Sequence, residues 1–177
     1  EVFRSLHSDR KRLAVVDYAG AKPTEVDAQG LLVLATLLAD RLKKATSAKR
    51  VGIVLPPGVG GVVANLAVVF ADKVPVNLNF SLGRAAVESS IERAGIDLLL
   101  SAEKMRAKLK DFPWIPGYLD VGTALEEIRG SKLRLMCRAL VLALPCGLAS
   151  SLLDIPRNGG DSEAGLLFTS GSSGMPK

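Results

Sequence analysis

The sequence predicts an α/β fold in which helices flank a mainly parallel sheet. Short continuous apolar runs alternate along the chain with longer segments whose apolar residues recur at helical spacing. Strands that alternate with helices are joined by right-handed crossovers, and such connections build parallel sheets. With 177 residues, 48% of them hydrophobic and 23% charged, the chain is long enough to bury one domain core.

The first expected elements are a strand, a turn and a long helix. Residues 13–18 form an apolar run that predicts the strand, and the turn at 19–23 leads to Thr24. Thr24 is a favourable helix N-cap with Asp27 three positions later, so the helix is expected to begin there. Its apolar stripe consists of Leu31, Leu32, Leu34, Ala35, Leu38 and Leu42.

After this helix the sequence continues to alternate between strands and helices. Gly95 is placed to end one of the helices, because a residue in the left-handed conformation commonly follows a helix. The run at residues 51–55 is apolar throughout, as expected where both faces of a sheet are covered. The expected strands cover residues 51–55, 74–78, 96–100, 118–121 and 164–168, and the expected helices cover 61–71, 82–94, 102–110 and 123–129.

The segment from Lys132 to Leu153 is apolar and interrupts this alternation. Arg134, Arg138 and Pro145 argue against a transmembrane span and predict a helix that is kinked or broken before Pro145. We therefore expect residues 131–163 to form an apolar helical insertion and a connector. Burial of the insertion in the intact protein is the favoured expectation, and peripheral contact with an anionic membrane stays open because basic residues begin the segment.

Charge, cysteine content and aromatic content narrow the function classes. The formal net charge of +5 and the isoelectric point of about 9.4 favour an anionic partner such as a nucleotide, an anionic lipid or an acidic protein. Aromatic residues are only 5% of the chain and do not interleave with basic residues, which argues against a nucleic-acid surface. Cys137 and Cys146 have no zinc or redox spacing and indicate reduced core residues of a cytoplasmic protein, while His7 indicates a solvated surface residue.

The run Gly58-Val59-Gly60-Gly61 follows a predicted strand and opens a helix, as a dinucleotide-binding loop does. The third glycine of that motif is absent, because Val63 occupies its position. No acidic residue stands near Leu78, where the ribose contact is expected. We interpret the small residues as the means by which helix and strand pack closely.

The last ten residues, Phe168 to Lys177, combine glycines, hydroxyls and one cation in a single loop. Glycines let backbone N–H groups approach a phosphate oxygen, and the lysine supplies a charge. A flexible linker has a similar composition, but the order of the residues favours a phosphate site. The P-loop pattern does not fit, since two residues separate Gly171 from Gly174 and Pro176 precedes Lys177. The predicted contacts to ATP phosphates are Thr169, Ser170, Gly171, Ser172, Ser173, Gly174 and Lys177.

The order Thr-Ser-Gly-Ser-Ser-Gly-Met-Pro-Lys closely resembles the phosphate loop of the adenylate-forming superfamily of acyl- and aryl-CoA ligases, luciferases and peptide-synthetase adenylation domains. Upstream, residues 49–56, 65–70 and 74–79 resemble the N-terminal subdomain of the same superfamily. Asn-Leu-Asn at 77–79, together with the apolar insertion, is most similar to the acyl-acyl carrier protein (ACP) synthetase domain of bifunctional 2-acylglycerophosphoethanolamine acyltransferase/acyl-ACP synthetases.

This resemblance implies that the whole enzyme uses ATP and Mg²⁺ to activate a fatty acid as an acyl-adenylate. The acyl group would then pass to a thiol of ACP or of CoA. The loop would hold the β- and γ-phosphates, and Lys177 would neutralise charge as pyrophosphate leaves. Two alternatives stay open: an adenylation domain for an amino or aryl acid, and a module that binds a membrane or a carrier protein.

The resemblance also implies which parts of the enzyme lie downstream of the loop. In the family these are the adenine and ribose contacts, the magnesium-binding glutamate, the acid pocket and the mobile C-terminal domain with its adenylation lysine. We therefore expect residues 1–177 to be the N-terminal portion of an adenylation domain, truncated at the phosphate loop. We expect this portion to carry no catalytic or metal-binding residue and to be inactive by itself.

Overall fold

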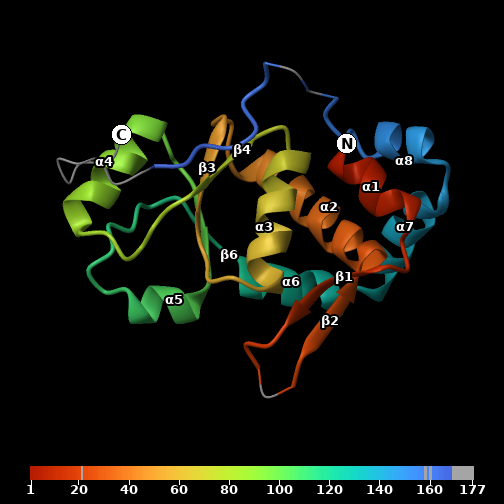
Figure 1. Cartoon of the computed structure of the whole chain (residues 1–177), viewed down its shortest axis with the longest axis horizontal. Helices are drawn as coiled ribbons and strands as arrows, with labels where there is room; N and C mark the ends of the chain where they lie inside the picture. Colours follow the sequence, from red (N-terminus) through yellow and green to blue (C-terminus); the bar gives the residue numbers. More distant parts are fainter. Residues whose placement is uncertain (21, 158, 160, 169–177) are drawn as a thin grey trace.

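A parallel sheet lies at the centre of the molecule (Figure 1). The computed structural model describes residues 1–20, 22–157, 159 and 161–168. Within these residues the sheet has four strands in the order β4-β3-β5-β6, and every neighbouring pair is parallel. The predicted α/β fold with a mainly parallel sheet and flanking helices is therefore confirmed. The strands are β3 (Arg50–Val54), β4 (Val74–Asn77), β5 (Leu99–Ser101) and β6 (Tyr118–Asp120).

Helices cover both faces of this sheet and create two apolar cores. The larger core joins one face of the sheet to α2 (Ala28–Ala45), α3 (Val59–Phe70) and α6 (Val121–Gly130). The smaller core joins the other face to α4 (Arg84–Ala94) and to the segment after α5 (Glu103–Lys108). Side chains alternate between the two cores along β3, with Val51 and Ile53 in the larger and Val54 in the smaller.

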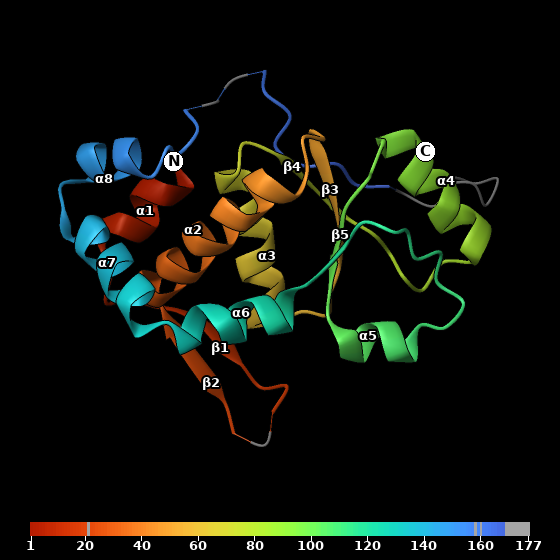
Figure 2. The same cartoon turned by 180° about the vertical axis from the view of Figure 1, so that it is seen from behind.

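A third helical layer packs on the side of α2 that faces away from the sheet, at the end of the molecule opposite α4 (Figures 1 and 2). It consists of α1 (Val2–Ser8), α7 (Lys132–Ala143) and α8 (Cys146–Leu152). α2 is consequently enclosed, and Leu32, Leu38 and Leu42 are fully buried. The interruption between α7 and α8 confirms the predicted break before Pro145.

The N-terminal part contains a β-hairpin that the sequence interpretation missed. β1 (Leu13–Asp17) and β2 (Thr24–Asp27) pair antiparallel and stand apart from the parallel sheet. The prediction that a helix begins at Thr24 is wrong, because β2 continues to Asp27 and buries Val26. Asp27 is the cap instead, and its Oδ1 accepts a hydrogen bond from the Gly30 N–H at 2.7 Å. The predicted strict alternation of strands and helices therefore begins only at α2.

Some of the other element boundaries differ from the expected ones, and one confirms the expectation. α3 begins at Val59 rather than at residue 61, and the strand expected at 96–100 is β5, which begins at Leu99. Gly95 adopts the left-handed conformation at φ 62° and ends α4 as predicted. The strand expected at 164–168 is reduced to a single bridge at Leu166.

The prediction that both cysteines are core residues is not met, whereas the expected burial of the insertion concerns the intact protein and stays a prediction. Leu142 is the only buried residue of α7, and Cys137 is exposed while Cys146 is half-buried. His7, expected in solvent, is half-buried with its ring stacked 5.7 Å from the ring of Phe3. These differences arise because the insertion lies on the outside of α2 and covers α1, so only one side of it is shielded. None of the described helices is both long and apolar enough to cross a bilayer.

Candidate functional site

The segment leading into the predicted phosphate loop runs along the free edge of β4. Leu166 pairs in parallel with Val76, and its N–H donates a hydrogen bond to the Pro75 carbonyl oxygen at 3.2 Å. Because the segment runs in the same direction as the strands, it leaves the sheet at their carboxyl ends. Ligands of α/β proteins bind at this edge of a sheet. The loop residues Thr169, Ser170, Gly171, Ser172, Ser173, Gly174 and Lys177 lie outside the described residues, so their contacts remain predictions.

An ion pair fixes the beginning of this segment. Arg50, the first residue of β3, donates from Nε and Nη2 to the two carboxylate oxygens of Glu163 at 2.9 and 3.1 Å. The Lys49 Nζ lies 3.7 Å from the same carboxylate. The hydrogen bonds from Arg50 lower the pKa of Glu163, burial opposes this shift, and the charges of Arg50 and Lys49 add to it. The segment is thus anchored at the amino end of β3 and directed toward the carboxyl end of β4.

Two asparagines organise the carboxyl end of β4. The Asn77 Nδ2 donates to the Asn65 Oδ1 at 2.8 Å, and the Asn65 Nδ2 donates to the Asn77 Oδ1 at 3.2 Å and to the Gly61 carbonyl oxygen at 2.9 Å. These bonds tie β4 to α3. Asn79 accepts hydrogen bonds from the N–H and hydroxyl of Ser81, which closes the turn after the strand. The Asn-Leu-Asn run therefore has a structural role that periodicity did not reveal.

An apolar depression lies next to this asparagine pair. Its volume is about 470 Å³, and its lining includes Leu55, Pro56, Val62, Leu66 and Asn77. Gly61 is required for its shape, because a Cβ there would lie 2.9 Å from the Pro56 carbonyl oxygen. This contact supports the interpretation that the small residues after β3 allow close packing. The depression offers an apolar wall beside the edge from which the predicted loop leaves.

The N-terminus of α3, where a dinucleotide phosphate would bind, already holds an anion of the protein. The Asp17 carboxylate accepts hydrogen bonds from the Val59 N–H at 3.0 Å and the Ala19 N–H at 2.8 Å. These two bonds lower the pKa of Asp17. Gly58 has a φ of 144°, and a Cβ there would lie 2.5 Å from Asp17 Oδ2. The geometry therefore argues against a pyrophosphate at this helix end.

The carboxyl ends of β5 and β6 are closed by hydrogen bonds within the protein. The Ser101 hydroxyl donates to the Val54 carbonyl oxygen at 2.6 Å. Asp120 accepts from the N–H groups of Glu103 and Thr123 and from the hydroxyl of Tyr118. Burial acts against ionisation of Asp120, but these bonds outweigh it and lower the pKa of its carboxyl. Burial, followed by the charge of Asp120, raises the pKa of Tyr118 to about 12. Both groups have structural partners, which leaves the ends of β3 and β4 as the open part of the edge.

The part of the chain that the structure describes contains no group of three or more histidine, cysteine, aspartate or glutamate side chains that could hold a metal ion.

Known proteins share both the sequence pattern and this fold. The family model of the AMP-binding enzymes matches residues 3–177. O-succinylbenzoate coenzyme A synthetase from Bacillus subtilis, in complex with AMP, superposes with a TM-score of 0.69 at 18% identity over 100% of this chain and 40% of that chain. The N-terminal subdomain of NpsA from Klebsiella oxytoca, in complex with 3-hydroxybenzoyl-AMSN, superposes with a TM-score of 0.68 at 18% identity over 99% of this chain and 38% of that chain.

A nonribosomal peptide synthetase, FmoA3, in its AMPPNP-bound form superposes with a TM-score of 0.61 at 20% identity, over 71% of this chain and 13% of that chain. This chain therefore spans two fifths or less of the length of these solved structures. At these identities the likeness shows the fold alone. No curated protein matches the chain.

Proposed function

Since the chain belongs to the family of AMP-binding, adenylate-forming enzymes and matches part of their N-terminal subdomain, we propose that it supplies the phosphate-binding loop of an ATP-dependent acid–thiol ligase. One observation carries the proposal. The segment that precedes the Thr-Ser-Gly-Ser-Ser-Gly-Met-Pro-Lys loop runs parallel to β4 and reaches the carboxyl edge of the sheet. A loop rich in N–H and hydroxyl donors is useful at that edge, because it can surround a phosphate without crossing the core.

The use of ATP is typical of this family, and bound ATP would supply the adenylyl group that activates the acid, with pyrophosphate as the leaving group. In our proposal Thr169, Ser170, Ser172 and Ser173 donate their hydroxyls to the terminal phosphates. Gly171 and Gly174 expose backbone N–H groups to the same oxygens, and Lys177 balances their charge. The Arg50–Glu163 pair acts indirectly, because it holds the segment from which the loop begins.

For the acid and the acceptor we propose a fatty acid and a thiol of ACP or CoA. The support is the Asn-Leu-Asn run at 77–79 followed by the apolar insertion, which together resemble acyl-ACP synthetases. An aryl or amino acid is the alternative. The similar solved proteins include an O-succinylbenzoate coenzyme A synthetase and complexes with 3-hydroxybenzoyl-AMSN and α-methyl-L-serine-AMP.

Exchange of radioactive pyrophosphate into ATP tests the proposal, since it reports the activation step without the thiol acceptor. The enzyme encoded by the gene extended past Lys177 should catalyse exchange that depends on a fatty acid, whereas residues 1–177 alone should not. A Lys177→Gln variant of the extended enzyme should lose most of the activity, with Lys104→Gln on α5 as the matched control. Exchange that responds to aryl or amino acids and ignores fatty acids would reject the proposed substrate class. Exchange unaffected by Lys177→Gln would reject the proposed role of the loop.

A further inference from the structure

The helical layer α7–α8 exposes a row of large apolar side chains. Leu133, Met136 and Leu140 are 67%, 59% and 63% exposed, and their spacing of three and four residues places them on one side of α7. In α8, Leu148 and Leu152 are 50% and 60% exposed. A surface helix of a globular protein normally turns such a row toward the core. Here the opposite side of α7, with Leu142, packs inward, so the row faces solvent.

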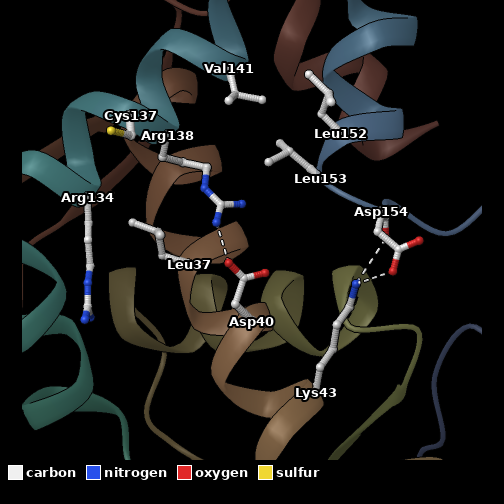
Figure 3. Close-up of a pocket in the computed structure, with 10 residues that line it drawn as sticks. All are labelled: Leu37, Asp40, Lys43, Arg134, Cys137, Arg138, Val141, Leu152, Leu153 and Asp154. Atoms are coloured by element: carbon white, nitrogen blue, oxygen red, sulfur yellow. Dashed lines mark hydrogen bonds and ion pairs between the residues drawn. The ribbon is translucent and has the colours of Figure 1, made fainter.

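Figure 3 shows how the inward side of α7 is fixed. Arg138 forms an ion pair with Asp40 of α2, and Lys43 of α2 pairs with Asp154 after α8 at 2.8 Å. The Arg10 guanidinium donates to the Leu142 carbonyl oxygen near the end of α7. These contacts join α7, α8 and α2, and the exposed row is therefore a fixed feature of the surface.

Within the segment that carries the row the charged residues are all basic, and the two carboxylates that share a pocket with Arg134 and Leu152, Asp40 and Asp154, are paired with Arg138 and Lys43. Residues 128–153 contain four basic residues and no aspartate or glutamate, although the whole chain has 18 acidic residues. Arg138 is neutralised by Asp40. Arg129, Lys132 and Arg134 are exposed or half-exposed, and none of them forms an ion pair with another residue that the structure describes. On a helical projection Lys132 and Arg134 lie on opposite borders of the row.

From this arrangement we propose that α7 and α8 lie against an anionic lipid bilayer, with the leucine–methionine row in the acyl boundary and the basic borders at the headgroups. Amphipathic helices bind membranes in this way, through buried apolar area together with attraction to anionic lipids. The composition of the segment fits a bilayer. Its apolar row consists of leucine and methionine, basic residues lie beside it and residues 128–153 contain no aspartate or glutamate, and interfacial helices have leucine on the apolar face and lysine or arginine on the polar face. The inference does not depend on the proposed ligase activity.

The test is co-sedimentation of the purified 177-residue chain with lipid vesicles. We expect binding to vesicles of phosphatidylcholine with phosphatidylglycerol and little binding to phosphatidylcholine alone, with the difference shrinking at high salt. A basic residue near an anionic surface is worth about 1 kcal/mol, so a Lys132→Gln/Arg134→Gln variant should bind about thirtyfold more weakly. A variant that replaces the row by serine should lose at least about tenfold in the partition coefficient. The row variant carries Leu133→Ser, Met136→Ser and Leu140→Ser.

Matched control variants test whether a loss of vesicle binding is specific to the row and its basic neighbours, since they remove apolar or basic side chains elsewhere on the surface. For the apolar set the control is the exposed face of the hairpin, with Leu13→Ser, Val16→Ser and Tyr18→Ser, whose side chains are 50%, 36% and 77% exposed. For the charges the control is Lys104→Gln/Lys108→Gln on α5. Both controls should bind like the unchanged chain. Equal losses in the controls, or no binding of the unchanged chain to anionic vesicles, would overturn the proposal.

A second measurement does not depend on whether the row variant folds. An environment-sensitive dye on the exposed Cys137, in a Cys146→Ser background, should shift to the blue when anionic vesicles are added. The same dye on a Tyr18→Cys variant that lacks both native cysteines should not shift. An unshifted dye at Cys137 would contradict the proposed orientation. A dimer in size-exclusion chromatography that disappears in the row variant would assign the row to a second copy of the chain and overturn the membrane assignment.

Discussion

The substitution Glu163→Gln is predicted to release the segment that leads into the phosphate loop while leaving the rest of the fold intact. In the structure the carboxylate accepts two hydrogen bonds from Arg50, at 2.9 and 3.1 Å. The side chains of Arg50 and Glu163 are 34% and 24% exposed, so solvent screens the pair only in part. For such a pair, with bidentate geometry, we expect a loss of about 1 kcal/mol. This loss should fall mainly on the local opening of residues 161–168.

Hydrogen exchange followed by mass spectrometry measures this local effect. The Leu166 N–H, which donates to the Pro75 carbonyl oxygen, should exchange about fivefold faster in the variant, as about 1 kcal/mol of local stability implies. The matched control is Glu88→Gln, which removes the exposed i,i+4 pair with Arg84. Any increase in hydrogen exchange caused by Glu88→Gln should be confined to α4 and should leave the exchange of Leu166 unchanged. Unchanged exchange at Leu166 in Glu163→Gln would refute the claim that Arg50 anchors the segment.

The same ion pair has a predictable pH dependence. The pKa of Glu163 is lower in the folded chain than its ordinary value, so its contribution is fully present above the unfolded pKa. It is lost as the pH falls through the folded pKa. Protection of Leu166 should therefore be constant from neutral pH down to about pH 5 and should decrease below the ordinary glutamate pKa of about 4.3. Glu163→Gln should remove this decrease, provided that exchange rates are corrected for intrinsic pH effects.

Two further substitutions test how the sheet and α3 are held. Asp17→Asn should lower the melting temperature at neutral pH, because the charge that caps α3 is lost. The pKa of Asp17 is lower in the folded chain than its ordinary value. The difference in melting temperature between the variant and the unchanged chain should therefore vanish as the pH falls through the folded pKa of Asp17. A melting temperature equal to that of the unchanged chain at pH 7 would contradict the capping role. Gly117→Ala should destabilise by about 3 kcal/mol in urea unfolding, because its Cβ would lie 1.8 Å from the Asp97 carbonyl oxygen. Gly130→Ala, which meets no atom within 4 Å, is the control and should be neutral or stabilising.

The parallel sheet could be predicted because its strands are buried on both faces. Val51 and Val54 of β3 point into different cores, so neither position tolerates a polar residue and the strand appears as an unbroken apolar run. Gly95 could likewise be predicted to end α4, since a left-handed residue at that point has a strong local preference for glycine. In these places the local sequence and the tertiary environment require the same residues.

The hairpin and the anchoring ion pair could not be predicted from the same evidence. Thr24 and Asp27 satisfy a helix-capping pattern, but β2 uses Thr24 as a strand residue and Asp27 as the cap. Arg50 and Glu163 are separated by 113 positions, and nothing in either neighbourhood indicates the other. The exposure of Cys137 could not be predicted from the sequence for another reason. Apolar residues surround most of α7 in projection, so the sequence alone does not tell which side faces α2.

Hydrogen bonding at the carboxyl edge of the sheet explains why the candidate site lies at one end of that edge. At β5 and β6 the side chains of Ser101 and Asp120 already satisfy backbone groups, and at α3 the Asp17 carboxylate occupies the helix N-terminus. An anion at either place would have to displace a bonded partner, leaving a buried or charged group unsatisfied. Next to β4 the segment 164–168 arrives instead with a single backbone bond from Leu166. A phosphate held by the following loop, as we propose, would not have to displace Glu163, because that carboxylate is bound to Arg50 at the opposite end of the strands.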